Sequence, residues 1–89
     1  MKAVITTTGV DKTGIIAAVT AILVENKVNV EDISQTIMQG YFMMFMLVDI
    51  SNMTGTFGEL AEKLSQKGKE MGLEIRIQKD EIFKAMHIV

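Results

Sequence analysis

The feature that most constrains the fold is the order in which two kinds of apolar repeat follow one another along the chain. Short β-branched or alternating stretches are typical of strands, whereas apolar residues three and four positions apart are typical of helices. The segments predicted as strands are Lys2–Thr8, Val30–Gln39, Tyr41–Ile50 and Leu73–Gln78. The segments predicted as helices are Ile15–Val24 and Phe57–Met71. The predicted order is therefore β-α-β-β-α-β.

Local signals at the ends of these segments support the same order. Gly40 in "MQGY" predicts a tight hairpin between the second and third strands, because glycine adopts a positive φ at little cost. Thr56 and Glu59 in "TFGE" predict a capping box at the start of the second helix. Gly72 stands where the C-cap of that helix is expected.

This order predicts an α+β, ferredoxin-like sandwich, in which two helices cover one face of a four-stranded antiparallel sheet. The chain has 89 residues and no linker or tandem repeat, so we expect a single domain over residues 1–89. Residues 80–89, "DEIFKAMHIV", form a C-terminal extension. The helical spacing of Ile82, Phe83 and Met86 predicts a short last helix there.

The third predicted strand is apolar on both faces. One row suits the helix-covered face and consists of Phe42, Met44, Met46, Val48 and Ile50. The other row carries Tyr41, Met43, Phe45 and Leu47, which monomers seldom leave uncovered. We therefore predict these four residues, together with Phe83 and Met86, as interface residues. The sequence leaves open whether the C-terminal segment, a second subunit or both cover the row.

Composition excludes several classes of function. The formal net charge is −2, which argues against binding nucleic acid or an anionic membrane. The chain has no cysteine, and His87 is its only histidine. Thiolate chemistry, Ser-His-Asp or Cys-His catalysis and multi-histidine metal sites are therefore not expected. The longest apolar run, "YFMMFMLV", is too short to span a bilayer. We expect a cytoplasmic, non-enzymatic protein with no cofactor and no metal.

Two functions of other proteins with this strand order fit poorly. RNA-binding domains stack bases on aromatic residues of the third strand, but Met43 replaces the expected aromatic and the net charge is negative. An acylphosphatase-like hydrolase would need an arginine in the loop after the first strand, whereas the only arginine is Arg76. Both remain minor alternatives.

The loop "GVDKTG", residues 9–14, is the main candidate for a binding site. It resembles the two-glycine frame of a phosphate loop, but Ile15 and Ile16 replace the lysine and hydroxyl residue that bind nucleotide phosphates. A helix that begins near Gly14 directs unpaired amides toward a carboxylate, and Asp11 suits an ammonium group. A free amino acid carries both groups. The alternative is that Asp11 or Thr13 only caps the helix.

The strand order, the opening "GVDKTGIIAAV" and the stretch "NKVNVEDISQTIMQGYF" together resemble the ACT domain family. The resemblance runs from Lys2 to about Gln78, and the tail resembles that of stand-alone bacterial ACT proteins. By pattern the chain is similar to the glycine cleavage system transcriptional repressor group, whose members have two ACT domains. The family often has a proline before the last loop glycine, where this chain has Thr13.

The resemblance implies a regulatory domain that forms a homodimer and binds an amino acid. In the family the ligand lies where the loop after strand one meets the second strand of a neighbour. Carried over by position, the ligand-binding residues are Gly9, Val10, Asp11, Lys12, Thr13, Gly14, Ile15, Asn29, Val30 and Ile33. The alternative is an interaction module that binds no ligand and uses its apolar sheet face to bind an unidentified protein.

Overall fold

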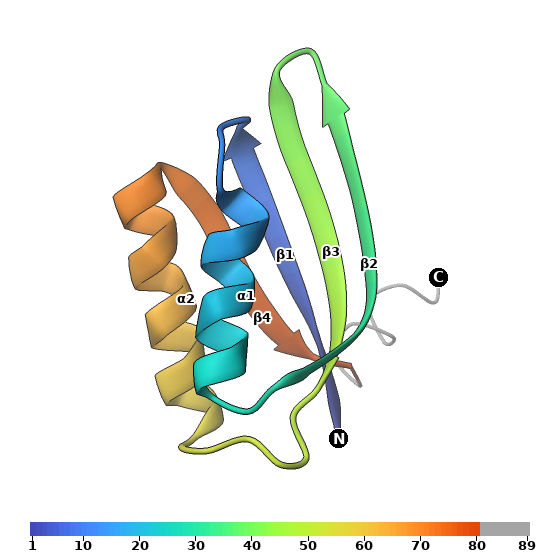
Figure 1. Cartoon of the computed structure of the whole chain (residues 1–89), viewed down its shortest axis with the longest axis vertical. Coiled ribbons are helices and arrows are strands. Elements are labelled where there is room, and N and C mark those ends of the chain that lie inside the picture. Colours follow the sequence, from blue (N-terminus) through green and yellow to red (C-terminus); the bar gives the residue numbers. More distant parts are fainter. Residues whose placement is uncertain (81–89) are drawn as a thin grey trace.

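The structure is a computed structural model that describes residues 1–80 of the chain. The elements are β1 (Lys2–Val10), α1 (Ile15–Glu25), β2 (Asn29–Met38), β3 (Tyr41–Asp49), α2 (Phe57–Met71) and β4 (Leu73–Lys79), as Figure 1 shows. The predicted order is confirmed, and each predicted boundary lies within two residues of the observed one. The short last helix predicted from "DEIFKAMHIV" falls, apart from Asp80, outside the described residues.

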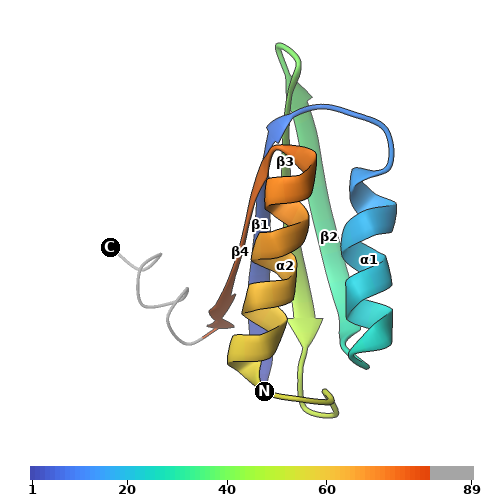
Figure 2. The same ribbon diagram turned by 90° about the vertical axis from the view of Figure 1, so that its left-hand side faces the viewer.

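The four strands form one sheet in the order β2-β3-β1-β4, and every neighbouring pair is antiparallel. Both helices lie on the same face of this sheet, as the two views in Figures 1 and 2 agree. The helices run antiparallel to each other, so the start of α1 and the end of α2 lie at the same end of the sheet. The predicted ferredoxin-like sandwich is confirmed.

The core lies between the sheet and the helices. Its largest fully buried side chains are Ile5, Val19, Leu23, Met44, Met46, Val48, Leu60 and Leu64. The predicted helix-facing row of β3 is buried over its full length, as expected for a strand in the middle of a covered sheet. Thr7 of β1 is also fully buried, and its hydroxyl has no hydrogen-bond partner among the residues that the structure describes.

The predicted hairpin joins β2 and β3 through Gln39 and Gly40. Met38 and Tyr41 are paired, and both intervening residues have positive φ angles, 51° for Gln39 and 83° for Gly40. Positive φ at both central positions defines a type I′ turn, which matches the twist of the flanking strands. The hairpin extends to the same end of the sheet as the β1–α1 loop (Figure 1).

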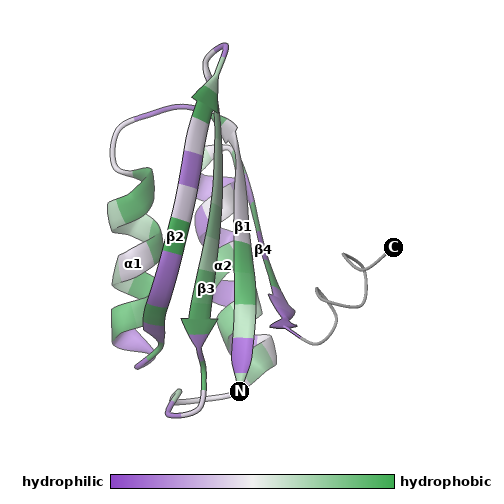
Figure 3. Cartoon of the chain, turned by 90° about the vertical axis from the view of Figure 1, so that its right-hand side faces the viewer, coloured by the Kyte–Doolittle hydropathy of each residue, from purple (hydrophilic) through white to green (hydrophobic). Residues whose placement is uncertain are grey.

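Within residues 1–80, no helix lies over the second face of the sheet. The strand register places four side chains of β3, those of Tyr41, Met43, Phe45 and Leu47, on this open face. Tyr41 and Phe45 are exposed and the other two are partly buried. In Figure 3 the ribbon of β3 is hydrophobic over most of its length, whereas the neighbouring edge strand β2 alternates. The apolar row predicted from the sequence therefore lies on the uncovered face.

Candidate ligand-binding site

The β1–α1 loop, residues 11–14, is exposed, but one backbone and one side-chain hydrogen bond join it to neighbouring elements. The backbone N–H of Asp11 donates to the carbonyl of Gly40 in the β2–β3 hairpin, with 2.9 Å between nitrogen and oxygen. The ammonium group of Lys12 donates to the carbonyl of Met71 at the end of α2. Lys12 therefore stabilises the negative end of the α2 dipole as well as fixing the loop.

The first turn of α1 has no cap made by a side chain within residues 1–80. Gly14 is the N-cap, with a left-handed backbone at φ 89°, and no acidic residue lies in the first turn. The alternative reading, in which Asp11 or Thr13 caps the helix, is therefore wrong. A Cβ built on Gly14 would meet no atom within 4 Å apart from its chain neighbours, so open space lies beside the N-cap. The free amides of this turn are available to a carboxylate.

Two of the predicted site residues have packing roles in this structure. A Cβ on Gly9 would lie 2.6 Å from Cδ2 of Leu73, so this glycine allows the start of β4 to approach β1 closely. The side chain of Ile15 is buried in the core beneath α1. If these two residues contact a ligand, the contact is through the backbone. Val10, in contrast, is an exposed apolar residue beside the loop.

The remaining predicted site residues lie on β2 and are Asn29, Val30 and Ile33. The first of them, Asn29, lies at the end of the sheet opposite the β1–α1 loop. Asn29 is paired with Asp49 of β3, whereas Val10 beside the loop is paired with Tyr41. Along β3, Tyr41 and Asp49 are separated by about 27 Å at roughly 3.4 Å per residue. Asn29 and Ile33 are exposed and Val30 is partly buried. One copy of the chain therefore does not bring Asn29 and the loop together.

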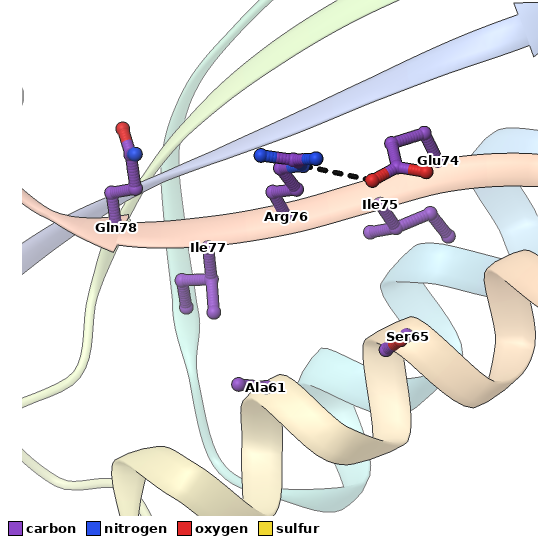
Figure 4. A pocket seen from close by; sticks show the side chains of 7 residues that line it. All are labelled: Ala61, Ser65, Glu74, Ile75, Arg76, Ile77 and Gln78. Carbon is purple, nitrogen blue, oxygen red and sulfur yellow. Dashed lines mark hydrogen bonds and ion pairs between the residues drawn. The ribbon is translucent and has the colours of Figure 1, made fainter.

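A surface hollow of about 410 Å³ lies between the edge strand β4 and α2. It is lined by Ala61, Ser65, Glu74, Ile75, Arg76, Ile77 and Gln78, which Figure 4 shows. Arg76 and Glu74 form an ion pair with 2.8 Å between nitrogen and oxygen, and both side chains are exposed. This hollow was not predicted from the sequence. The only signal for it is the pair of small residues, Ala61 and Ser65, one turn apart on α2.

The groups with shifted pKa values lie away from the loop. The hydroxyl and backbone N–H of Ser51 hold the pKa of Asp49 below its usual range. The backbone N–H of Thr56 does the same to the pKa of Glu59. A hydrogen bond and ion pair with Glu31 raises the pKa of Lys2. These shifts follow from exposed structural contacts and indicate no acid–base chemistry.

The described part of the chain offers no group of three or more histidine, aspartate or glutamate side chains placed to hold a metal ion. Within the same residues, neither helix is long and apolar enough to cross a membrane.

Comparison with known proteins identifies the family. The sequence profile of the ACT domain matches residues 2–78. A UPF0237 protein of Clostridium acetobutylicum is 52% identical over 89 residues, which cover 100% of both chains. The chain therefore belongs to the ACT domain family, and its ferredoxin-like fold agrees with this. Proteins of this family are regulatory rather than catalytic.

Solved structures agree with this assignment. An ACT domain protein from Streptococcus pneumoniae superposes with a TM-score of 0.81 and 38% identity, covering 93% of each chain. The regulatory subunit of aspartate kinase from Thermus thermophilus, in its ligand-free form, has a TM-score of 0.67 and 28% identity over 89% of this chain and 51% of that one. A protein named as a glycine cleavage system transcriptional repressor shares the fold, with a TM-score of 0.72 and 22% identity over 88% of this chain and 44% of that one. The resemblance predicted from the sequence is confirmed.

Proposed function

We propose that this ACT domain is a cytoplasmic regulator that binds a free amino acid, or a similar small metabolite, between two copies of the chain. The observation that carries the proposal is the bare first turn of α1, which opens onto free space in a loop held in place by Asp11 and Lys12. The family supports it, since ACT domains are generally regulatory domains that bind small ligands.

The chemistry of the loop suits both charged groups of an amino acid. The amides that follow Gly14 and the positive end of the α1 dipole favour a carboxylate. The carboxylate of Asp11 is exposed in the same loop and is the natural partner of an ammonium group. A ligand with only one of these groups would lose one of the two contacts, so we expect weaker binding of simple carboxylates and amines.

A second copy supplies the missing side of the site if the two β2 strands pair. β2 is an edge strand, and nine of its ten residues are exposed. Antiparallel pairing of β2 with β2 of a second copy reverses the strand direction, so the partner's Asn29 would lie near Met38 of the first copy. Met38 adjoins the hairpin whose Gly40 carbonyl accepts from Asp11. The same pairing would cover the long edge of β2, which isolated sheets seldom leave free.

In this arrangement the ligand favours one packing of the two copies over another. An amino acid that bridges the loop of one copy and Asn29 of the other stabilises the packing in which both sides are present. The ligand shifts that equilibrium only by the difference between its affinities for the two states. The signal then passes to a separate protein that binds one of the two states.

Thermal unfolding against a panel of free amino acids tests the proposal, with the mass in solution measured alongside. We expect a saturable rise in the melting temperature with one amino acid or a related group of them, in a sample with the mass of a dimer. At a ligand concentration 100 times its dissociation constant, the stabilisation is about 2.7 kcal/mol. The absence of a shift with every amino acid would contradict the proposed ligand class.

The Asp11→Ala variant tests the site itself. It should lose the amino-acid effect and keep its fold, because the side chain of Asp11 is exposed and makes no hydrogen bond within the described chain. Glu62→Ala is the matched control, since it removes one exposed carboxylate from α2 and should respond as the unmodified chain does. An unchanged response in Asp11→Ala would show that the ligand binds elsewhere.

The second candidate function is an interaction module that binds no small molecule. The apolar side chains on the open face of β3 favour it, because such a row is typical of a covered surface. It predicts a stable assembly whose melting temperature responds to no amino acid. The panel experiment therefore separates the two candidates.

A further inference from the structure

The sheet has a second edge at β4, on the side away from β2. In the order β2-β3-β1-β4, the only strand of residues 1–80 that pairs with β4 is β1. The outer edge of the β4 backbone therefore presents N–H and C=O groups that a further strand can pair with. The hollow of about 410 Å³ between β4 and α2 lies along this edge.

The hollow gives room for the side chains of an added strand. In Figure 4, Ile75 and Ile77 point from β4 toward α2. Ala61 and Ser65 of α2 line the hollow and are short, so the helix leaves space beside the strand. Because side chains alternate along a strand, every second side chain of an added strand would enter the hollow. Ile77 is only partly buried, so an apolar side chain beside it would remove further apolar surface from water.

The charges on the other face of β4 indicate which strand fits the edge. The side chains of Glu74 and Arg76 are 62% and 69% exposed, and they point to the same side because they are two residues apart. A matching antiparallel strand carries a cation opposite Glu74 and an anion opposite Arg76. The β4 strand of a second copy, read in the reverse direction, has its arginine and glutamate in this order.

The same charges select the register of such a pair. When two β4 strands pair antiparallel about Ile75, Glu74 of each copy lies opposite Arg76 of the other, which forms two ion pairs between the copies. A pairing about Glu74 or about Arg76 would instead place like charges directly opposite each other, which is destabilising. The ion pair within each chain is exposed and therefore weak, so its exchange for pairs between copies costs little.

We propose that the outer edge of β4 is a second pairing surface for another copy of this chain, in antiparallel register about Ile75. The pairing spans five residues, 73–77, whereas β2 has ten, so association at β4 should be the weaker of the two. It would join the dimers proposed at β2 into rows as the protein concentration rises. The two edges lie at opposite sides of the sheet, so pairing at β4 depends neither on the ligand site nor on pairing at β2.

Charge reversal, followed by sedimentation velocity at low salt and rising protein concentration, tests the pairing. The mass of the unmodified chain should rise with concentration. Arg76→Glu and Glu74→Arg each place like charges opposite each other, so each should weaken this association by about tenfold or more. The two variants change the net charge in opposite directions, so a weakening in both is not a general charge effect. The double variant restores both ion pairs and should associate as the unmodified chain does.

Glu70→Arg is the matched control, because it makes the same change in net charge as Glu74→Arg at an exposed position of α2 and should leave the association unchanged. A mass that does not rise with concentration would overturn the proposal. A single variant that associates as the unmodified chain does, or a double variant that associates no better than the single ones, would also overturn it. A chain that is monomeric when dilute, and forms a dimer sensitive to these charges, would support pairing at β4 and contradict pairing at β2.

Discussion

The two helices of this domain differ most at their N-termini. At the start of α2, the Thr56 hydroxyl accepts from the backbone N–H of Glu59 at 3.1 Å, and the Glu59 carboxylate accepts from the backbone N–H of Thr56 at 2.8 Å. Gly72 ends the helix in a left-handed conformation, and Lys69 lies in the last turn. At the start of α1, Gly14 offers no side chain, and neither the first nor the last turn carries a charge that complements the dipole.

This difference separates a structural helix from a candidate binding helix. α2 satisfies its first amides with its own residues, which contributes about 1 kcal/mol to the stability of the fold. α1 lacks that contribution, and its first amides remain available for an outside anion. The bare helix end is the one next to the held loop, which is the basis of the proposed site.

The largest predicted effect concerns the packing of α2 on β4. A Cβ on Gly68 would lie 2.6 Å from the carbonyl oxygen of Leu73, a backbone atom that a rotamer change does not move. Gly68→Ala should therefore destabilise the domain by about 2–3 kcal/mol and lower its melting temperature by about 8 °C or more. Gly58→Ala on the same helix meets only the Thr56 hydroxyl, at 3.9 Å, and should be neutral or stabilising. Equal melting temperatures of the two variants in calorimetry would contradict the close approach of α2 to β4.

The next effect tests the bare end of α1. Gly14→Ala places a Cβ in open space but on a left-handed backbone. Any loss of stability in this variant would therefore not come from steric contact with neighbours. The strained backbone alone should cost about 1–2 kcal/mol, measured by denaturant unfolding. Gly14→Asn should cost less, because asparagine tolerates this conformation better than alanine. A neutral Gly14→Ala variant would show that α1 does not begin in the described conformation.

The capped end of α2 gives a similar but smaller effect. Thr56→Ala removes the hydroxyl that accepts from Glu59 and should destabilise the domain by about 1 kcal/mol. The melting temperature should fall by about 4–8 °C. Thr54→Ala is the control, because the described structure shows no hydrogen bond from the Thr54 side chain. Equal melting temperatures of the two variants would show that the capping box does not stabilise the domain.

The smallest effect is the pH dependence of the same cap. The backbone N–H of Thr56 lowers the pKa of Glu59, so the cap's stabilisation is present above the ordinary glutamate pKa and is lost as the pH falls through the lowered value. In the Glu59→Gln variant the side chain at this position does not titrate. The difference in melting temperature between the unmodified chain and this variant should therefore narrow between pH 5 and about pH 3. A constant difference over that range would contradict the assignment.

The fold was predicted well from the sequence because the signals for its helices, strands and turns come from residues close together in the chain. The capping box at Thr56 and the turn at Gly40 depend on residues within four positions of each other, and both are observed. The hollow beside β4 was not predicted, because it depends on how α2 lies against an edge strand. Among the described residues the buried hydroxyl of Thr7 has no hydrogen-bond partner. The sequence did not predict this, because threonine is an ordinary residue in a strand.

The candidate site, unlike the fold, stays a prediction. The sequence predicts the loop as the candidate, and the resemblance to the ACT family implies a ligand contact for Gly9. That contact stays a prediction, and the structure adds a packing role for Gly9 against Leu73. It also left open whether Asp11 or Thr13 caps α1, which only the described backbone decides. Asn29 lies far from the loop within one chain, so the proposed ligand contact of Asn29 depends on a second copy.

The most direct test of the central claim is a titration of the ¹⁵N-labelled protein with free amino acids, followed through its backbone amide signals. We predict that one amino acid causes saturable shifts at Asp11, Gly14 and Ile16, together with shifts at Asn29. The amides at the start of α2, between Phe57 and Glu59, should stay in place. Shifts at α2 in place of α1, or no saturable shift with any amino acid, would contradict the account.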